Sequence, residues 1–245
     1  MILAAGLGTR LRPLTGDRPK ALVEVAGRTM LEIALARLRA CGVREVIVNV
    51  HYFADMVIDY LKKNDNFGMR IEISREEVLL DTGGGLKKAA GFFLEGSGDA
   101  ESPFLLHNVD VISTIDLNRM AQFHVENRAL ATLAVQHRET SRYLLFDSQD
   151  QLCGRRTGPG SKDEIVRTSR VAEPLAFCGI HVISPRLFAL LTEEGVFSII
   201  SSYLRLAAQE EKILAFHADE YYWRDLGRPA DVRQAAQERK HQALP

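Results

Sequence analysis

The first residues with evident chemical potential form a glycine-containing loop directly after a short apolar segment, residues 1–5. Gly6 and Gly8 allow the backbone to bend tightly and to bring its N–H groups close to a ligand, and successive amides in such a turn suit phosphate oxygens. Arg10 can bond two oxygens at once, and Lys20 adds a point charge. These residue types and their spacing predict a site for nucleotide phosphates.

Two common phosphate loops do not fit this segment. The dinucleotide fingerprint needs a third glycine at the position of Leu11. The Walker A loop needs a Gly-Lys pair, whereas Lys20 follows Pro19 and lies far from Gly8. The remaining alternative is an ordinary charged turn after an edge strand, which the long run G-x-G-T-R-L-x-P-L-T disfavours.

Two aspartates far apart in the sequence are candidate magnesium ligands. Asp110 ends a strongly apolar strand, where a carboxylate is costly unless it faces a cation or several donors. Asp225 follows aromatic residues and precedes a glycine turn at Gly227. Mg²⁺ usually takes one or two protein carboxylates together with phosphate oxygens and water. The alternatives are capping roles, Asp110 at a helix start and Asp225 as N-cap of a helix beginning near Pro229.

Residues 81–85, which are Asp81, Thr82 and three glycines, are expected to begin a helix. Glycines cost about 1 kcal/mol each in a helix relative to alanine, so their presence indicates a close backbone approach. A flexible surface loop is the alternative. His107, next to the aspartate-bearing segment, is expected in the core rather than in catalysis.

Helix and strand patterns alternate in the first half of the chain, which predicts an α/β fold with a doubly wound, mostly parallel sheet. Such sheets bind ligands beyond the carboxyl ends of their strands, where residues 6–20, 81–85 and 108–110 are expected. We expect helices at 30–41, 53–63 and 82–94, and strands at 44–50, 69–74 and 103–112.

The second half follows a different pattern, with strands joined directly to one another. After a helix at 116–127 we expect strands at 129–138 and 142–147, a loop at 154–162, and a strand at 177–183. Helices at 185–193 and 199–211, a strand at 213–216 and a helix from Pro229 follow. We therefore predict one domain over residues 1–245, in which 1–128 bind the nucleotide and 129–245 add a substrate-binding lobe.

Composition narrows the possible partners. The 245 residues carry a net charge of −1, so there is no global basic field for nucleic acid or an anionic membrane. Cys41, Cys153 and Cys178 are isolated, as expected for buried thiols in a reducing cytosol. No apolar run reaches the length of a membrane helix. We expect a cytoplasmic protein, monomeric or a small homo-oligomer, that contacts neither nucleic acid nor membrane.

The run from Leu3 to Gly27, L-A-A-G-x-G-T-R-L-x-P-L-T…P-K-x-L-x-x-V-x-G, resembles the signature of sugar-1-phosphate nucleotidyltransferases. The similarity continues through residues 81–85, 108–110 and 223–227, so it spans nearly the whole chain. The resemblance implies a Rossmann-like nucleotidyltransferase fold. It also implies an enzyme that makes a nucleoside-diphosphate sugar and pyrophosphate from a nucleoside triphosphate and a sugar 1-phosphate, with Mg²⁺.

The resemblance also implies roles for individual residues. Arg10 would hold the outgoing pyrophosphate, Lys20 would contact phosphate near the new bond, and Asp110 would complete the catalytic set, with Asp110 and Asp225 as metal ligands. The nucleotide would contact Leu3, Ala4, Ala5, Gly6, Gly8, Thr9, Arg10, Lys20, Asp81, Thr82, Gly83 and Gly84. The sugar phosphate would contact Asn108 and Gly179.

Two departures from the family pattern affect these expectations. Val109 stands before the metal-binding aspartate, where the family often has a small residue. The Glu-Lys-Pro segment with which many relatives bind the sugar phosphate has no match. The cations near the corresponding position are Arg155, Arg156 and Lys162, and our hypothesis is that Arg156 contacts the sugar phosphate. Likeness to the short bacterial uridylyltransferases favours UTP. The alternatives are a cytidylyltransferase acting on a phosphorylated alcohol such as phosphocholine, and an inactive regulatory protein that binds nucleotide sugars.

Overall fold

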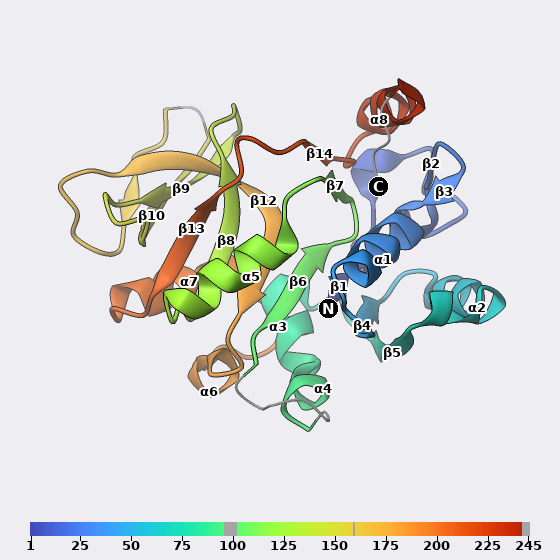
Figure 1. Ribbon diagram of the computed structural model, residues 1–245, viewed down its shortest axis with the longest axis horizontal. Helices are drawn as coiled ribbons and strands as arrows, with labels where there is room; N and C mark the ends of the chain where they lie inside the picture. Colours follow the sequence, from blue (N-terminus) through green and yellow to red (C-terminus); the bar gives the residue numbers. More distant parts are fainter. Residues whose placement is uncertain (96–101, 159, 242–245) are drawn as a thin grey trace. The chain divides into compact units, whose positions relative to one another are not determined.

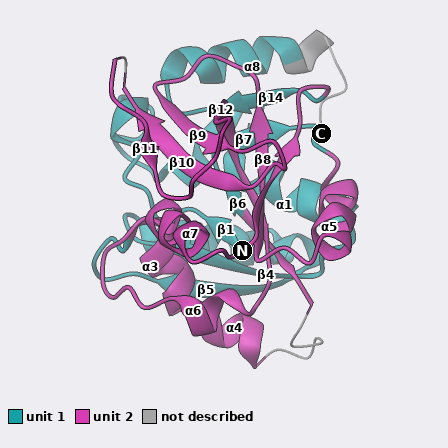
Figure 2. Cartoon of the chain, turned by 90° about the vertical axis from the view of Figure 1, so that its left-hand side faces the viewer, with its two compact units in different colours: residues 1–80, 107–115, 221–245 teal, residues 81–106, 116–220 magenta. Residues whose placement is uncertain are grey.

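The computed structural model describes residues 1–95, 102–158 and 160–241. The chain forms two compact units, coloured separately in Figure 2. Unit 1 contains residues 1–80, 107–115 and 221–245, and unit 2 contains residues 81–106 and 116–220. These units differ in their bounds from the expected halves at 1–128 and 129–245, and that functional division stays a prediction.

Unit 1 is built on parallel strands (Figure 1). In the order β5, β4, β1, β6 each strand runs parallel to the next, with Ile2 opposite both Val48 and His107. The carboxyl ends of β1 and β6 therefore lie at one edge, where the glycine loop and Asp110 begin. The strands of unit 1 are β1 (Ile2–Leu3), β2 (Glu24–Val25), β3 (Arg28–Thr29), β4 (Glu45–Val50), β5 (Arg70–Arg75), the end of β6 (Phe104–Asn108), β7 (Val111–Ser113) and β14 (Trp223–Asp225).

The first helix of unit 1 is amphipathic, as its sequence requires. Helix α1 (Met30–Ala40) begins at Thr29, whose hydroxyl accepts a hydrogen bond from the Glu32 amide at 3.1 Å and so caps the first turn. Its apolar residues Leu31, Leu35 and Leu38 are buried on one face. The remaining helices are α2 (Ala54–Lys63), α8 (Pro229–His241) and the short 3₁₀ turns η1 (Thr9–Leu11), η2 (Lys20–Leu22) and η3 (Asp65–Gly68).

Unit 2 is built on a mainly antiparallel group of strands. Strand β8 (Ala131–Gln136) pairs antiparallel with β12 (Glu173–Ile183) and parallel with β13 (Ile213–His217). Strand β12 also pairs antiparallel with β9 (Arg142–Phe146). Strand β9 pairs antiparallel with β10 (Leu152–Thr157), and β10 pairs antiparallel with β11 (Glu164–Ile165). The helices are α3 (Asp81–Lys88), α4 (Ala90–Leu94), α5 (Leu117–Glu126), α6 (Leu187–Leu190) and α7 (Ile199–Ala208). In the described part of the chain, no helix is long and apolar enough to cross a membrane.

Several expected elements differ from the structure. The strand expected at 103–112 is two strands, β6 and β7, because the chain turns at Val109 and Asp110 and β7 then pairs with β14. The helix expected at 82–94 is divided at Ala89 into α3 and α4. The helix expected at 185–193 is the single turn α6. The prediction of a loop at 154–162 is wrong for residues 154–157, which belong to β10 and pair with β9.

An ion pair after α6 gives unit 2 a pH-dependent contribution to stability. Arg205 donates two hydrogen bonds to Glu193, at 2.8 and 2.9 Å, and these bonds lower the pKa of Glu193 to about 2. Since this pKa lies below the ordinary value, the stabilisation is present above about pH 4.5 and is lost as the pH falls toward 2. We expect Glu193→Gln to lower the free energy of unfolding by about 1 kcal/mol at neutral pH.

Urea denaturation at neutral pH and at about pH 3 measures this effect, and the difference between wild type and variant should shrink at the lower pH. The matched control is Glu194→Gln. The Glu194 side chain is 84% exposed and pairs with Lys87, so its removal should cost almost nothing. An equal loss of stability in both variants would contradict the assignment.

Candidate active site

A strand pair in unit 1 brings together the two aspartates that the sequence singles out. Strands β7 and β14 pair antiparallel with Asp225 opposite Val111, and the Leu226 amide donates a 2.8 Å hydrogen bond to the Asp110 carbonyl. This register puts Asp110 next to the end of β14. Asp110 is buried, at 7% exposed. Two carboxylates distant in sequence therefore meet at the edge where β6 ends.

The electrostatics of Asp225 reflect this neighbour. Burial, and next the negative charge of Asp110, raise the pKa of Asp225, while the cations Lys20 and Arg10 act in the opposite direction. One Asp225 oxygen, Oδ1, accepts a 2.6 Å hydrogen bond from the Gly227 amide. Asp225 therefore belongs to a cluster of two acidic and two basic side chains. The alternative role of Asp225 as the N-cap of α8 has no support. Its side chain accepts a hydrogen bond from the Gly227 amide, and Gly227 precedes α8.

Lys20 is an internal partner of Asp110 rather than a surface lysine. It opens η2, directly after Pro19, and its Nζ makes an ion pair with Oδ2 of Asp110. The two side chains are only 15% and 9% exposed. The pair neutralises a carboxylate that would otherwise be buried beside a second one.

Gly6 and Gly8 have different roles in the loop. Gly8 has φ +63°, and a Cβ there would lie 3.0 Å from Thr15 Cγ2 and 3.2 Å from Lys20 Cβ. The Thr15 hydroxyl also donates to the Gly8 carbonyl at 2.8 Å, so Gly8 fixes the fold of the loop. A Cβ at Gly6 would meet nothing within 4 Å, and Gly6 is exposed. The space beside Gly6 is therefore open to a ligand.

Arg10 lies on the same side of the loop as the acidic pair. A Cβ added to Gly227 would come within 3.1 Å of Arg10 Nη2 and 2.5 Å of Asp225 Oδ1. The absence of a side chain at Gly227 is therefore what lets the Arg10 guanidinium approach the carboxylate. The Arg10 residue as a whole is exposed, so its remaining donors are open to solvent.

Sequence reasoning missed two buried polar residues that position the start of the loop. Asn49 Oδ1 accepts a 2.7 Å hydrogen bond from the Ala4 amide, and Asn49 Nδ2 donates to Glu76 Oε1 at 2.7 Å. The second Glu76 oxygen accepts from the Leu80 amide at 2.9 Å. Asn49 and Glu76 are 2% exposed. The feature of the sequence that could have indicated this role is a single asparagine within the apolar run Val46–Val50.

The chemistry of this cluster fits Mg²⁺. Asp110 and Asp225 offer hard carboxylate oxygens, close enough for the charge of one to shift the pKa of the other. Two carboxylates with phosphate oxygens and water form the usual magnesium donor set. His107 is fully buried and burial lowers its pKa to about 4, so it is neutral at physiological pH and adds no charge here.

The other predicted nucleotide and sugar residues fall into both units. Leu3, Ala5, Thr9 and Asn108 belong to unit 1, at the ends of β1 and β6 or in the loop. Asp81, Thr82, Gly83, Gly84, Arg156 and Gly179 belong to unit 2. The structure joins Arg10, Lys20, Asp110 and Asp225, and the roles of all these residues stay predictions.

Three of the unit 2 residues have local structural partners. A Cβ at Gly83 would clash with the Phe197 ring, and the Gly83 amide donates to the Phe197 carbonyl at 2.9 Å, which is the close approach expected of this glycine segment. Gly179 has φ +73° within the irregular part of β12. Arg156 makes two hydrogen bonds to Asp163, at 2.6 and 3.0 Å.

Comparison with known proteins identifies the family. The nucleotidyl transferase family model matches residues 1–152, which include the glycine loop, Lys20 and Asp110. The chain belongs to the nucleotidyl transferase family. The match ends before Asp225, so the carboxylate on β14 lies outside the part that the family model covers.

Curated relatives of this nucleotidyl transferase extend the similarity over almost the whole chain. It is 38% identical to N-acetylmuramate alpha-1-phosphate uridylyltransferase of Caulobacter vibrioides, over 94% of this chain and 91% of the relative. It is 31% identical to mannose-1-phosphate guanyltransferase of Yarrowia lipolytica, over 94% of this chain and 61% of that protein. These relatives confirm the resemblance to sugar-1-phosphate nucleotidyltransferases.

Solved structures confirm the predicted α/β, doubly wound, Rossmann-like fold. UDP-glucose pyrophosphorylase from Acinetobacter baumanii superposes with a TM-score of 0.79 at 18% identity, covering 99% of this chain and 94% of that one. HddC from Yersinia pseudotuberculosis, complexed with GMP-PN, superposes with a TM-score of 0.74 at 23% identity, covering 97% of each chain. At these identities the similarity concerns the fold alone.

Proposed function

We propose that this nucleotidyl transferase forms a nucleoside-diphosphate sugar and pyrophosphate from UTP and a sugar 1-phosphate. The observation that carries the proposal is the cluster of Arg10, Lys20, Asp110 and Asp225 at the end of the glycine loop. UTP and a sugar 1-phosphate are favoured because the 38% identical relative is a uridylyltransferase that acts on N-acetylmuramate alpha-1-phosphate.

The residues of the cluster suit an in-line displacement at phosphorus. A phosphate oxygen of the sugar 1-phosphate attacks the α-phosphorus of the nucleoside triphosphate, and the bond to pyrophosphate breaks. The attacking oxygen is already anionic at neutral pH, so the step needs no general base. Catalysis then depends on positioning and charge stabilisation, with Lys20 on the reacting phosphates and Arg10 and the loop amides on the leaving pyrophosphate.

In this proposal Asp110 and Asp225 hold Mg²⁺. A bound Mg²⁺ would supply positive charge that neutralises phosphate oxygens beside the two carboxylates. Lys20 pairs with Asp110 in the free protein, so it must exchange this carboxylate for phosphate when the substrates bind. The exchange leaves Asp110 free to face the metal.

A pyrophosphate-release assay with Mg²⁺, across nucleoside triphosphates and a panel of sugar 1-phosphates, tests the proposal. We expect the highest kcat/KM with UTP, and N-acetylmuramate 1-phosphate is the first acceptor to try. Turnover only with CTP and a phosphorylated alcohol would favour the cytidylyltransferase alternative. Nucleotide-sugar binding without turnover would favour the inactive regulatory protein. The cytoplasmic location, the absence of nucleic-acid and membrane contacts, and a monomeric or small homo-oligomeric state also stay predictions.

We predict that Arg156→Ala raises the KM for the sugar 1-phosphate by about 10- to 100-fold, the value of one charged hydrogen bond to phosphate. Arg156 lies near the end of β10 with its guanidinium on Asp163, and its side chain is 36% exposed. The measurement is the KM for the sugar phosphate at saturating nucleotide.

The matched control is Arg155→Ala. Arg155 is the preceding residue of β10, so its side chain points to the opposite face of the strand, where it pairs with Glu164 at 2.6 Å. Its loss should leave KM unchanged. An unchanged KM in Arg156→Ala would remove this arginine from the sugar-phosphate site.

A further inference from the structure

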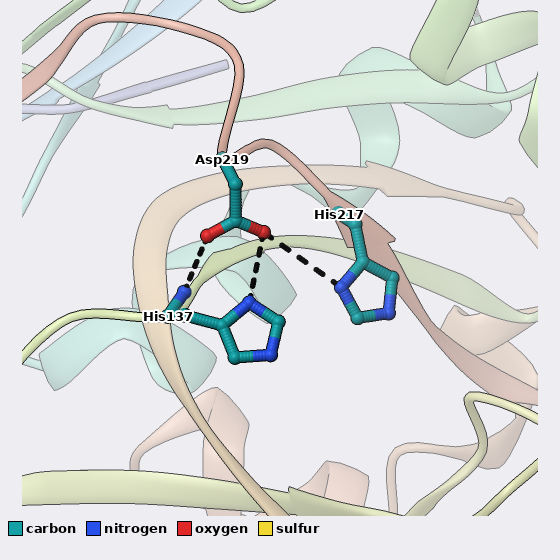
Figure 3. A group of neighbouring side chains, drawn as sticks. All are labelled: His137, His217 and Asp219. Carbon is teal, nitrogen blue, oxygen red and sulfur yellow. Dashed lines mark hydrogen bonds and ion pairs between the residues drawn. The ribbon is translucent and has the colours of Figure 1, made fainter.

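Two histidines and an aspartate gather at one end of the central strands of unit 2 (Figure 3). His217 is the last residue of β13 and pairs in register with Val135 of β8. His137 lies two residues beyond Val135, so both imidazoles come from the same face of neighbouring strands. Asp219 follows two residues after His217. None of these residues belongs to the proposed nucleotide site.

The aspartate is fixed between the two rings. Oδ1 of Asp219 accepts a 2.6 Å hydrogen bond from the His137 amide. Oδ2 lies 3.0 Å from His137 Nδ1 and 3.9 Å from His217 Nδ1. The turn that carries it is tied to β8, since the Ala218 amide donates to the Val135 carbonyl and the Ala218 carbonyl accepts from Gln136, both at 2.8 Å. Figure 3 shows both Nδ1 atoms directed to this carboxylate.

Each histidine has a second carboxylate on its far nitrogen. His137 Nε2 lies 2.9 Å from Glu173 Oε1, and His217 Nε2 lies 2.8 Å from Asp150 Oδ1. A neutral histidine that donates Nε2–H to a carboxylate presents its Nδ1 lone pair on the other side. This is the arrangement that orients histidines around metal ions in proteins.

We propose that His137, His217 and Asp219 form a binding site for Zn²⁺ on unit 2. Zn²⁺ takes imidazole nitrogen and carboxylate oxygen at about 2.0–2.2 Å in tetrahedral geometry, which separates its ligand atoms by about 3.3 Å. The 3.0 and 3.9 Å separations bracket that value, and all three ligand atoms lie within 4.8 Å of one another. A water would complete the coordination.

The choice of metal follows from the donor atoms and the charge. Imidazole suits Zn²⁺ and its neighbours in the first transition series, whereas Mg²⁺ prefers oxygen ligands alone. Three carboxylates, Asp150, Glu173 and Asp219, surround the two rings. With neutral histidines the cluster carries net negative charge, so a divalent cation is favoured electrostatically.

A proton competes with the metal for this site. The Glu173 and Asp219 carboxylates raise the pKa of His137 above its ordinary value, and a protonated ring cannot bind Zn²⁺. The charged groups around the two rings include Asp150, Glu173 and Asp219, and Arg119 and Glu126 line the hollow beside His217.

Isothermal titration of the full-length, chelator-stripped protein with ZnCl₂, in excess Mg²⁺ so that oxygen-only sites are occupied, tests the site. We expect one Zn²⁺ per chain. Asp150→Asn, which loses the carboxylate behind His217, should weaken binding about 10- to 100-fold. His217→Gln and Asp219→Asn each remove a direct ligand and should weaken it more.

The matched control is Glu220→Gln, which removes an exposed carboxylate beside Asp219 that pairs with Arg119 instead. It should bind Zn²⁺ as wild type does, and so should Asp110→Asn, which separates this site from the proposed magnesium ligands. Co²⁺ in place of Zn²⁺ should give the intense visible bands of tetrahedral coordination. Absence of binding, or wild-type binding in both His217→Gln and Asp219→Asn, would overturn the proposal.

Discussion

We expect Asp110→Asn to reduce kcat by at least about 10³-fold, because loss of a metal ligand forfeits several kcal/mol of charge stabilisation in the transition state. The amide keeps the size of the carboxylate but removes its charge. Lys20 then loses its ion-pair partner, yet Asp225 remains in the same cluster as a counter-charge. The loss of fold stability should therefore be modest.

Pyrophosphate release under saturating substrates measures the loss of turnover, and thermal unfolding checks that the variant is folded. The matched control is Asp17→Asn, whose side chain is 75% exposed and pairs with Arg18. That variant should keep wild-type kcat. Retained activity in Asp110→Asn would show that the proposed metal ligand is wrong.

The second large effect is expected for Lys20→Met, which keeps the aliphatic stem and removes the ammonium group. We expect kcat to fall by about 10²- to 10³-fold, the usual cost of losing one positioned donor to a developing charge. The variant also leaves Asp110 buried beside Asp225 without its cation, so the free energy of unfolding should fall.

The two proposed roles of the cluster can be separated in this variant. If Asp110 and Asp225 hold Mg²⁺, added Mg²⁺ should restore part of the lost stability of Lys20→Met, because a ligand that binds only the folded protein stabilises it. It should not restore kcat. Arg18→Ala, which removes a more exposed cation from the same loop, is the matched control. A free energy of unfolding that does not change when Mg²⁺ is added would indicate that the carboxylates do not bind the metal.

The sequence predicted most of the regular elements and the four charged residues of the cluster. Periodicity identified α1 and β4 almost to the residue because their apolar faces are buried against the rest of unit 1. Asp110 was recognisable because a carboxylate at the end of an apolar strand is costly without a partner, and the structure shows Lys20 as that partner.

Other features could not be predicted because they depend on contacts between distant residues. Periodicity treats residues 103–112 as one apolar run, and only the pairing of β7 with β14 explains the break at Asp110. The sequence gives no reason for the polar Asn49 within an apolar strand. The reason is its hydrogen bonds to the Ala4 amide and to Glu76, which only the fold brings close to it. The histidines of the proposed zinc site are far apart in sequence and show no ligand spacing, so only the register of β8 and β13 brings them together.

The assembly of unit 1 from three separate stretches of chain has a consequence for folding. During synthesis the first 80 residues can form the parallel strands β1, β4 and β5 and the glycine loop, but Asp110 has no second carboxylate beside it until residues 221–225 emerge. The contact that closes this part of the unit, from the Tyr222 amide to Thr114, joins residues 108 positions apart. Such non-local contacts form slowly, because the loop between them must close before they are made. The proposed magnesium ligands should therefore come together late, after all of unit 2 has been synthesised, and nascent chains ending before residue 221 should be unable to carry out the transfer.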